Sequence, residues 1–376
     1  MSTEKNKVTP KIFNILSIIF FLYIFLVSID LMSHAFKGFG KSFAEQLITT
    51  TSNPFVGLFI GILATSIIQS SSTTTSMVVA FVASGTITIT GAIPIIMGAN
   101  IGTTVTNTLV ALGHITRKEE FKRAMSGSTL HDFFNILTVI ILFPIEMKTH
   151  YLQRAGTFLA SIFVDMGGMK FTSPIKFMIR PVVNFINNAL ETYLGISGTF
   201  LSIVLLASAI IILFVALYNI TRIMRTLVIN KADMVFSRVI GGNAILAMFM
   251  GMLFTAIVQS SSITTSILVP LVAAGILEIE HSFPIVLGAN VGTTVTAILA
   301  SFTGNIAGVT VAFVHLVFNI TGILIIYPIK AFRRIPLRVA RFVSEICAER
   351  KIFAFVYVFG IFYLLPIFLI VISRYF

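Results

Sequence analysis

Long apolar runs separated by short basic stretches make up most of the chain. Four of these runs hold about the 20 residues that a helix needs to cross the hydrocarbon core of a membrane. A fifth, shorter run covers 133–145. The runs are continuous and do not alternate with polar residues, so they predict transmembrane helices and not strands. The four long runs are 12–36, 199–218, 309–329 and 352–372.

Composition supports the same class of protein. Of the 376 residues, 56% are hydrophobic and 11% are charged, and the mean hydropathy is +1.00. A soluble domain carries about 25% charged residues, so this chain lacks the charge to cover a water-facing surface. We therefore expect an all-α polytopic membrane protein with one transmembrane domain over 1–376. The single Cys347 allows no internal disulfide.

The net charge is +12, and the basic residues cluster in the loops between the apolar runs. The positive-inside rule explains this distribution, so no nucleic acid partner is expected. The stretch 303–308, predicted outside, has no Lys or Arg, whereas 148–193, also predicted outside, is moderately basic and fits less well. The segments predicted to be cytoplasmic are 1–11, 114–122, 221–238 and 333–351.

The sequence repeats itself. QSSSTTTS begins at residue 69 and QSSSITTS at 259, 190 positions later. GANIGTTVT at 98–106 recurs as GANVGTTVT at 288–296 with the same offset, and HDFFN at 131–135 resembles HLVFN at 315–319. We predict repeat one over about 12–147, a connector over about 148–195, repeat two over about 196–330, and a basic interfacial segment with a last span over 331–376.

Each repeat contains apolar stretches too short to cross alone. Those at 55–68 and 74–84 suit a re-entrant hairpin with QSSS at its tip, and those at 92–98 and 103–112 suit a discontinuous helix unwound at the GAN glycines. With one full span on either side, each repeat crosses the membrane an odd number of times. The second repeat is therefore predicted to be inverted relative to the first, with the two tips entering from opposite sides.

The hydroxyl and amide groups of both tips indicate a binding site. Irregular polar backbone persists at membrane depth only against protein or a water-filled cavity, and inverted repeats with broken helices are typical of a transporter's central site. Helices expected to begin near Thr74 and Thr264 would present N–H groups that favour an anion. Oxygens of the GAN segments suit a small cation. Because no Arg or Lys lies in the motifs, co-bound Na+ would balance the charge of a small oxyanion.

At these motifs the chain resembles the type II sodium–phosphate cotransporter family, the bacterial relatives of the animal kidney and gut transporters. The resemblance implies inward symport of inorganic phosphate with Na+ by alternating access, in the inner or plasma membrane, without another cofactor. It implies phosphate contacts from Gln69, Ser70, Ser71, Ser72, Gln259, Ser260, Ser261 and Ser262. Sodium ligands, or the adjacent pocket, would come from Thr73, Thr74, Asn100, Thr103, Thr104, Thr264, Asn290, Thr293, Thr294 and Thr296.

Many bacterial members of that family carry a cytoplasmic regulatory domain after their last span. This chain ends at Phe376, so such control is expected to be missing or supplied by another chain. A homodimer and a separate cytoplasmic regulator stay open as partners.

Alternatives from other classes also stay open. The tips could serve a transporter of another oxyanion, such as arsenate, sulfate or a carboxylate, or form the filter of an anion channel. His131 and Asp132 with a tip serine would suggest a hydrolase, but no nucleophile elbow is present. Helix capping or interhelical hydrogen bonding is the favoured role of these two residues. No phosphate-binding loop for ATP occurs.

The arginines of 333–351 are expected to touch anionic headgroups, or to dock a cytoplasmic partner.

Overall fold

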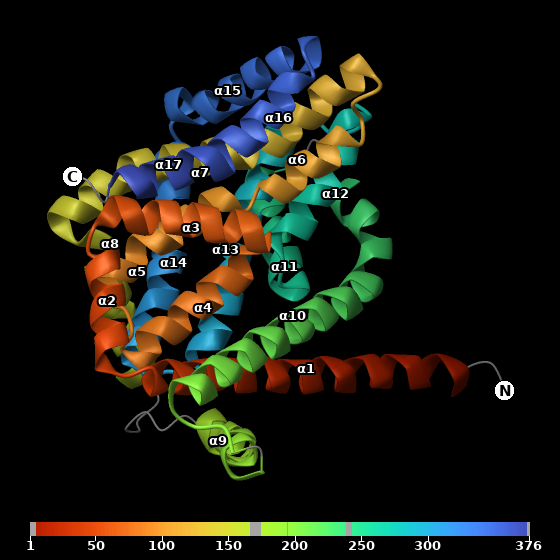
Figure 1. Ribbon diagram of the computed structural model, residues 1–376. Coiled ribbons are helices and arrows are strands. Elements are labelled where there is room, and N and C mark those ends of the chain that lie inside the picture. The colour runs from red at the N-terminus through yellow and green to blue at the C-terminus, as the bar shows by residue number, and fades with distance from the viewer. Residues whose placement is uncertain (1–4, 166–173, 194, 238–242, 374–376) are drawn as a thin grey trace.

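The computed structural model consists mainly of helices in the residues it describes, which are 5–165, 174–193, 195–237 and 243–373 (Figure 1). No strand occurs in these ranges, so the all-α prediction is confirmed. The first half contributes α1 (Lys5–Gly38), α2 (Lys41–Thr51), α3 (Pro54–Ile68), α4 (Ser71–Ser84), α5 (Ile89–Gly102), α6 (Val105–Leu112), α7 (Lys118–Thr149) and α8 (Tyr151–Asp165). After α9 (Pro174–Asn188) and a π-helical turn (Ala189–Tyr193), the second half contributes α10 (Gly198–Ser237), α11 (Ala244–Val258), α12 (Ser261–Ala273), α13 (Ile279–Ser301), α14 (Ile306–Ile326), α15 (Lys330–Glu349), α16 (Ile352–Phe359), a π-helical turn (Gly360–Leu364) and α17 (Leu365–Ile372).

Seven stretches of the described residues are long and apolar enough to cross a membrane. The pair α2 and α3, bent by 99°, would add an eighth if it formed one span. The five spans predicted from apolar runs are all among the seven. The complete set is Phe13–Gly38, Ile89–Leu112, Lys118–Thr149, Gly198–Met224, Ile279–Ser301, Ile306–Ile326 and Ile352–Ile372.

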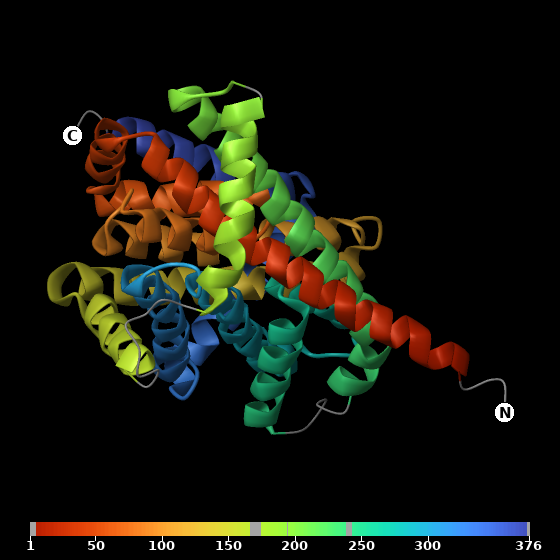
Figure 2. The same cartoon turned by 90° about the horizontal axis from the view of Figure 1, so that it is seen from below.

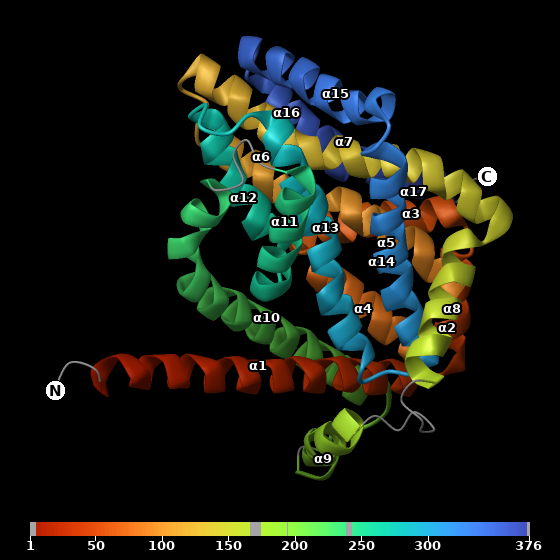
Figure 3. The same ribbon diagram turned by 180° about the vertical axis from the view of Figure 1, so that it is seen from behind.

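The first helix of each half forms one edge of the molecule. α10 crosses α1 along this edge, and α4 packs onto α1 from the body of the protein (Figures 1 and 3). Buried Phe25, Ile29 and Leu213 belong to this contact. The ring of Phe36 at the end of α1 lies 4.2 Å from that of Phe81 in α4, measured between centroids. α1 and α10 thus bury one face against α4, and Figure 2 shows α1 extending past the body towards its N-terminus.

The same helix pair occurs in both halves, because α3 packs along α5 and α11 packs along α13. The glycines of the GAN motifs lie in these contacts. A Cβ atom built on Gly98 would overlap the carbonyl oxygen of Leu58, and one on Gly288 would overlap that of Met248. Small residues spaced in this way let two membrane helices approach closely. The glycines therefore serve helix packing.

This packing corrects the prediction that the GAN glycines unwind the helix. α13 continues through the motif of the second half without a break. In the first half, α5 ends at Gly102 and α6 begins at Val105, yet Thr103 and Thr104 between them keep right-handed helical backbone angles. The prediction of a discontinuous helix is wrong for the second half, and the first half has only a two-residue interruption. Apolar pairing with α3 and α11 outweighs the low helix propensity of glycine.

Two predicted connecting segments contain helices among their described residues. The connector at 148–195 contains α8, which packs against α14, and α9, which contacts α1. Glu146 fixes the corner before α8, since its Oε2 accepts a hydrogen bond of 2.6 Å from the backbone N–H of Leu152. The basic segment after α14 is the amphipathic helix α15, which lies against α7 (Figure 1).

Candidate functional site

The first QSSS motif forms a two-residue corner between α3 and α4. α3 ends at Ile68, and Gln69 takes a left-handed conformation with φ of 57°. Ser70 then adopts an extended conformation, and its Oγ accepts a hydrogen bond of 3.2 Å from the N–H of Thr73. This is the geometry of a helix N-cap, so α4 begins directly after the corner.

The second motif folds in the same way. Gln259 ends α11 with φ of 60°, and the Oγ of Ser260 accepts a hydrogen bond of 3.4 Å from the N–H of Ile263. The two helices after the corners begin at Ser71 and Ser261, earlier than the predicted starts near Thr74 and Thr264, because Ser70 and Ser260 cap them by accepting from the third N–H of each helix.

The two corners meet inside the protein. The Oγ of Ser72 donates a hydrogen bond of 3.2 Å to the carbonyl oxygen of Gln259, across 187 positions of sequence. Ser71, Ser261 and Ser262 are buried beside this contact, whereas the side chain of Gln69 is exposed. The structure thus brings residues from both predicted phosphate-binding sets into one polar centre.

The two tip glutamines are held differently. Gln259 accepts a hydrogen bond of 2.7 Å from Thr296 through its Oε1, and its Nε2 donates one of 2.6 Å to the carbonyl oxygen of Ala256. The side chain of Gln69 forms no hydrogen bond with the described residues. Thr106, which corresponds to Thr296 in the repeat, has a buried hydroxyl that finds no partner among the described residues. Hydrogen bonds therefore hold the glutamine side chain of the second tip in place, whereas the glutamine side chain of the first tip has none among the described residues.

Most predicted sodium-site threonines donate their protons to carbonyl groups of their own helix. Thr103 donates to Ala99 at 3.0 Å, and Thr293 donates to Ala289 at 3.0 Å. Thr74, Thr264 and Thr294 do the same within their helices. A hydroxyl that donates its proton keeps lone pairs on its oxygen, so these groups remain able to face a cation with oxygen.

The asparagines of the GAN motifs join the two halves of the chain. The Oδ1 of Asn100 lies 3.3 Å from Nε2 of His315 in α14. The Oδ1 of Asn290 forms the equivalent hydrogen bond with Nε2 of His131 in α7. All four side chains are buried. The sequence predicted the asparagines as sodium ligands or as part of the adjacent pocket and did not predict these histidine partners, although the repeat of HDFFN in HLVFN carried the signal.

Asn135 and Thr104 extend this network around His131. The Nδ2 of Asn290 donates to Oδ1 of Asn135 at 2.9 Å, and the Nδ2 of Asn135 donates to the carbonyl oxygen of Asn100 at 3.0 Å. Thr104 Oγ1 lies 2.8 Å from Nδ1 of His131. Buried networks of this kind fix one arrangement of the helices that carry them.

Asp132 attaches the last apolar segment to this centre. The hydroxyl of Tyr357 in α16 donates a hydrogen bond of 2.6 Å to Oδ2 of Asp132, and both residues are buried. Of the two roles predicted for Asp132, helix capping and interhelical hydrogen bonding, the structure shows the second. A second tyrosine of the segment, Tyr363, donates to the carbonyl oxygen of Ser66 in α3 at 2.8 Å.

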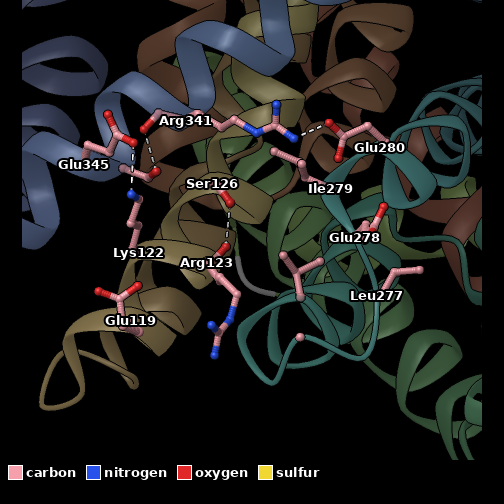
Figure 4. Close-up of a pocket in the computed structure, with 13 residues that line it drawn as sticks. Glu119, Lys122, Arg123, Ser126, Leu277, Glu278, Ile279, Glu280, Arg341 and Glu345 are labelled. Atoms are coloured by element: carbon pink, nitrogen blue, oxygen red, sulfur yellow. Dashed lines mark hydrogen bonds and ion pairs between the residues drawn. The ribbon is translucent and has the colours of Figure 1, made fainter.

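A cavity of about 530 Å³ lies between the start of α7, the turn from α12 to α13, and α15 (Figure 4). Lys122 from α7 pairs with Glu345 from α15 at 2.9 Å, and Arg341 from α15 pairs with Glu280 from α13. Arg123 donates a hydrogen bond of 2.7 Å to the carbonyl oxygen of Ala273. The basic start of α7 and the basic helix α15 therefore lie at the same end of the molecule.

The fold and this centre define a helical membrane protein whose two repeats contribute paired polar corners to one interior site. The family model for the Na+/Pi-cotransporter matches residues 24–171 and 211–336. The chain belongs to this family. The resemblance found from the motifs is confirmed, and the family description agrees with the expectation of a transporter in place of an enzyme.

Individual relatives match most of the chain. It is similar to sodium-dependent phosphate transport protein 2B of Homo sapiens, with 32% identity over 92% of this chain and 63% of that protein. It is also similar to protein 2A of Rattus norvegicus, with 31% identity over 97% and 68%, and to protein 2A of Ovis aries, with 33% identity over 92% and 65%. The chain thus spans slightly less than two thirds of the length of most of these relatives. No solved structure matches the chain.

Proposed function

We propose that the chain is a secondary active transporter that carries inorganic phosphate into the cell together with Na+ across the inner or plasma membrane. The observation that carries this proposal is the contact between the two QSSS corners, through Ser72 and the carbonyl oxygen of Gln259. The relatives named sodium-dependent phosphate transport proteins support the choice of phosphate and Na+.

Phosphate would bind between the two corners. α4 and α12 begin there, and the free N–H groups of a helix N-terminus favour an anion. The hydroxyls of the QSSS serines and the amide groups of Gln69 and Gln259 would supply further donors. With no Lys or Arg in either motif, the site would discriminate by hydrogen-bond geometry and by the co-bound cations.

Sodium would bind next to the phosphate, against oxygens of the GAN segments and of the threonines that follow. Hydroxyl and amide oxygens are hard ligands of the kind that small cations prefer. The unpartnered hydroxyl of Thr106 and the exposed side chain of Gln69 support a ligand role for the first tip. Binding of Na+ would then neutralise the charge that phosphate introduces at membrane depth.

Alternating access would use two inverted repeats, over about 12–147 and 196–330. The contacts of the hairpin turns support the inversion. The turn after α4 lies near Asn305, whose Nδ2 donates to the carbonyl oxygen of Ala83 at 3.2 Å. The turn after α12 lies near Arg123 at the start of α7. Because 303–308 and 114–122 are predicted on opposite sides of the membrane, the two turns would be too.

A pair of matched cysteine variants tests the inversion. Thr88→Cys and Glu278→Cys, in a Cys347→Ala background, occupy equivalent exposed positions 190 residues apart at the starts of α5 and α13. In intact cells, a membrane-impermeant maleimide should label Thr88→Cys, and Glu278→Cys should react only after the cells are opened. Labelling of both from the same side would exclude inverted repeats.

Transport itself is tested by uptake of radiolabelled phosphate into proteoliposomes, with an inward Na+ gradient or with K+ in place of Na+. Saturable accumulation above equilibrium with Na+ alone is expected. Equal, unsaturated flux in K+ would support the anion channel, and stronger competition by sulfate or a carboxylate than by phosphate would change the substrate. Arsenate, which shares the geometry of phosphate, should compete.

The site is tested by removing the two tip amides. Gln69→Ala and Gln259→Ala should each lower Na+-dependent uptake. Gln69→Ala should leave the amount of folded protein similar, whereas Gln259→Ala also removes the hydrogen bond from Thr296, so its uptake is compared per amount of folded protein. Gln46→Ala, at an exposed glutamine of α2 outside both motifs, is the matched control and should transport normally. Wild-type uptake in both tip variants would contradict the site between the corners.

A further inference from the structure

A second cavity, of about 470 Å³, lies between the start of α13, the end of α14 and the helix α15. Four guanidinium groups and one carboxylate line it within the described residues, and the carboxylate of Glu280 already pairs with Arg341. The lining therefore carries a formal excess of three positive charges. We call this cavity the arginine pocket, lined by Arg333, Arg334, Arg338 and Arg341 with Glu280 and Tyr327.

The neighbouring cavity of Figure 4 provides a contrast. Its lining mixes carboxylates with cations, and the close-up shows Lys122 directed to Glu345 and Arg341 directed to Glu280. Four carboxylates there offset three cations, so the lining carries no excess of positive charge. In the arginine pocket, by comparison, Arg334 and Arg338 form no ion pair with a described carboxylate.

Two features of the pocket favour a phosphate group. Arg334 and Arg338 are exposed one helical turn apart, where like charges repel unless an anion lies between them. The guanidinium of Arg333 lies 5.2 Å from the ring centre of Tyr327, a contact that orients it beside the pocket. Guanidinium groups bind phosphate oxygens with paired hydrogen bonds. The volume lies in the range of about 300–1,000 Å³ that is usual for small-molecule sites.

The surface of α15 indicates where such a group would come from. One face of the helix is buried against the protein, through Leu337, Ala340 and Ser344. Another face carries exposed Phe332 and Phe342, of which Phe342 is 63% exposed. An amphipathic helix with exposed aromatic residues next to arginines is typical of the membrane interface. The headgroups of phospholipids are the phosphate compounds present at that depth.

We propose that the arginine pocket binds the phosphate group of an anionic phospholipid, whose acyl chains lie along the exposed apolar face of α15. The lipid would tie α15 to the bilayer at the end of the molecule where α15 packs against α7. This inference does not depend on phosphate transport, since it concerns a different cavity and a ligand that is not carried.

The test compares two double variants of the same basic segment. Arg334→Gln with Arg338→Gln removes two pocket cations, and Arg350→Gln with Lys351→Gln removes two exposed cations that lie outside the pocket. Binding of phosphatidylglycerol and of phosphatidylcholine to purified protein is titrated by native mass spectrometry. Thermal unfolding of both variants should match that of the wild type, since the four side chains are exposed.

The wild type should bind phosphatidylglycerol more tightly than phosphatidylcholine. The pocket variant should lose on the order of 30-fold in affinity for phosphatidylglycerol, while the control variant stays within about threefold of the wild type. Equal losses in the two variants would mean a diffuse electrostatic attraction and would overturn the pocket. Displacement of the lipid by inorganic phosphate at lower concentration than by soluble phosphatidylglycerol would overturn the lipid as occupant.

A charge-preserving variant keeps the proposal testable if the glutamine variant folds poorly. Arg334→Lys with Arg338→Lys retains the positive charge and loses the paired hydrogen bonds of the guanidinium. It should bind phosphatidylglycerol more weakly than the wild type. Wild-type affinity in this variant would contradict recognition of a phosphate group by the two arginines.

Discussion

The Nε2 of His315 lies 3.3 Å from Oδ1 of Asn100, although the two residues belong to different halves of the chain. The repeat-related pair forms the same kind of hydrogen bond with the halves exchanged, since His131 lies in the first half and Asn290 in the second. Each half thus supplies the histidine for the asparagine of the other. Because a buried amide oxygen without a partner is unfavourable, each GAN asparagine depends on the other half of the chain for the partner of its Oδ1.

The surroundings of the two histidines predict unequal effects on stability. His131 also has Thr104 and Asn135 within hydrogen-bonding distance, whereas Nδ1 of His315 has no partner among the described residues. His131→Leu should therefore lower the melting temperature more than His315→Leu, with a hydrogen bond in a membrane protein contributing about 0.6–2 kcal/mol. Circular dichroism of the purified variants during heating measures this, and a larger loss for His315→Leu would contradict the network.

The hydrogen bond between Thr296 and Gln259 predicts that the equivalent threonines, Thr296 and Thr106, contribute differently to stability. Thr296→Val removes the 2.7 Å hydrogen bond to Gln259 and should destabilise the protein by about 1 kcal/mol. Thr106→Val removes a hydroxyl without a described partner, so its thermal stability should stay unchanged or rise. If that hydroxyl serves Na+ or phosphate, the same variant should lose Na+-dependent uptake. A Thr106→Val protein that is stable and fully active would remove Thr106 from the site.

Close packing at the GAN glycines predicts that adding one methyl group there destabilises the protein. Gly98→Ala and Gly288→Ala would each overlap a backbone carbonyl of the paired helix, so both should destabilise by about 1–3 kcal/mol or more. Gly360→Ala, in the π-helical turn before α17, meets nothing within 4 Å and is the matched control. Equal yields of folded protein for all three variants, by size-exclusion chromatography, would contradict the close approach of α5 to α3 and of α13 to α11.

The apolar runs and the 190-residue repeat were enough to predict the helical class, the spans and the two corners, because these depend on local pattern. They did not predict that α13 runs through GANVGTT, since the helical state of Gly288 depends on its contact with α11, which is distant in sequence. Nor did they predict the hydrogen bonds between the histidine of each half and the asparagine of the other. Each of these features needs the partner helix to be known, and a single sequence does not provide the pairing.

The structure also separates two roles that the sequence combined. Gln69 and Gln259 both precede three serines and share a left-handed backbone conformation, yet one side chain is exposed and the other is bonded to Thr296. This difference lies in the tertiary environment of each corner and not in its motif. It gives the two tips unequal freedom to contact a ligand in the conformation described.

The single cysteine predicts how the folded protein responds to thiol reagents and to pH. Cys347 is buried in α15 against Phe121 and Ala124 of α7, and α15 is not among the helices apolar enough to cross the membrane. Burial raises the pKa of this thiol from 9.0 to about 11. Because the thiolate is the reactive form, maleimide should label the folded protein very slowly near neutral pH and rapidly once the protein is unfolded in denaturant.

The direction of the pKa shift also sets a pH window for stability. A group whose pKa is higher in the folded state holds its proton more tightly there, so its contribution is present below the unfolded pKa and is lost as pH rises towards about 11. Cys347→Ala should therefore show a shallower loss of thermal stability between about pH 9 and pH 11 than the wild type. Ser197→Cys in the Cys347→Ala background places a thiol at an exposed position and serves as the labelling control. Labelling of Cys347 in the folded protein as fast as that of the control would show that α15 is not packed against α7 as described.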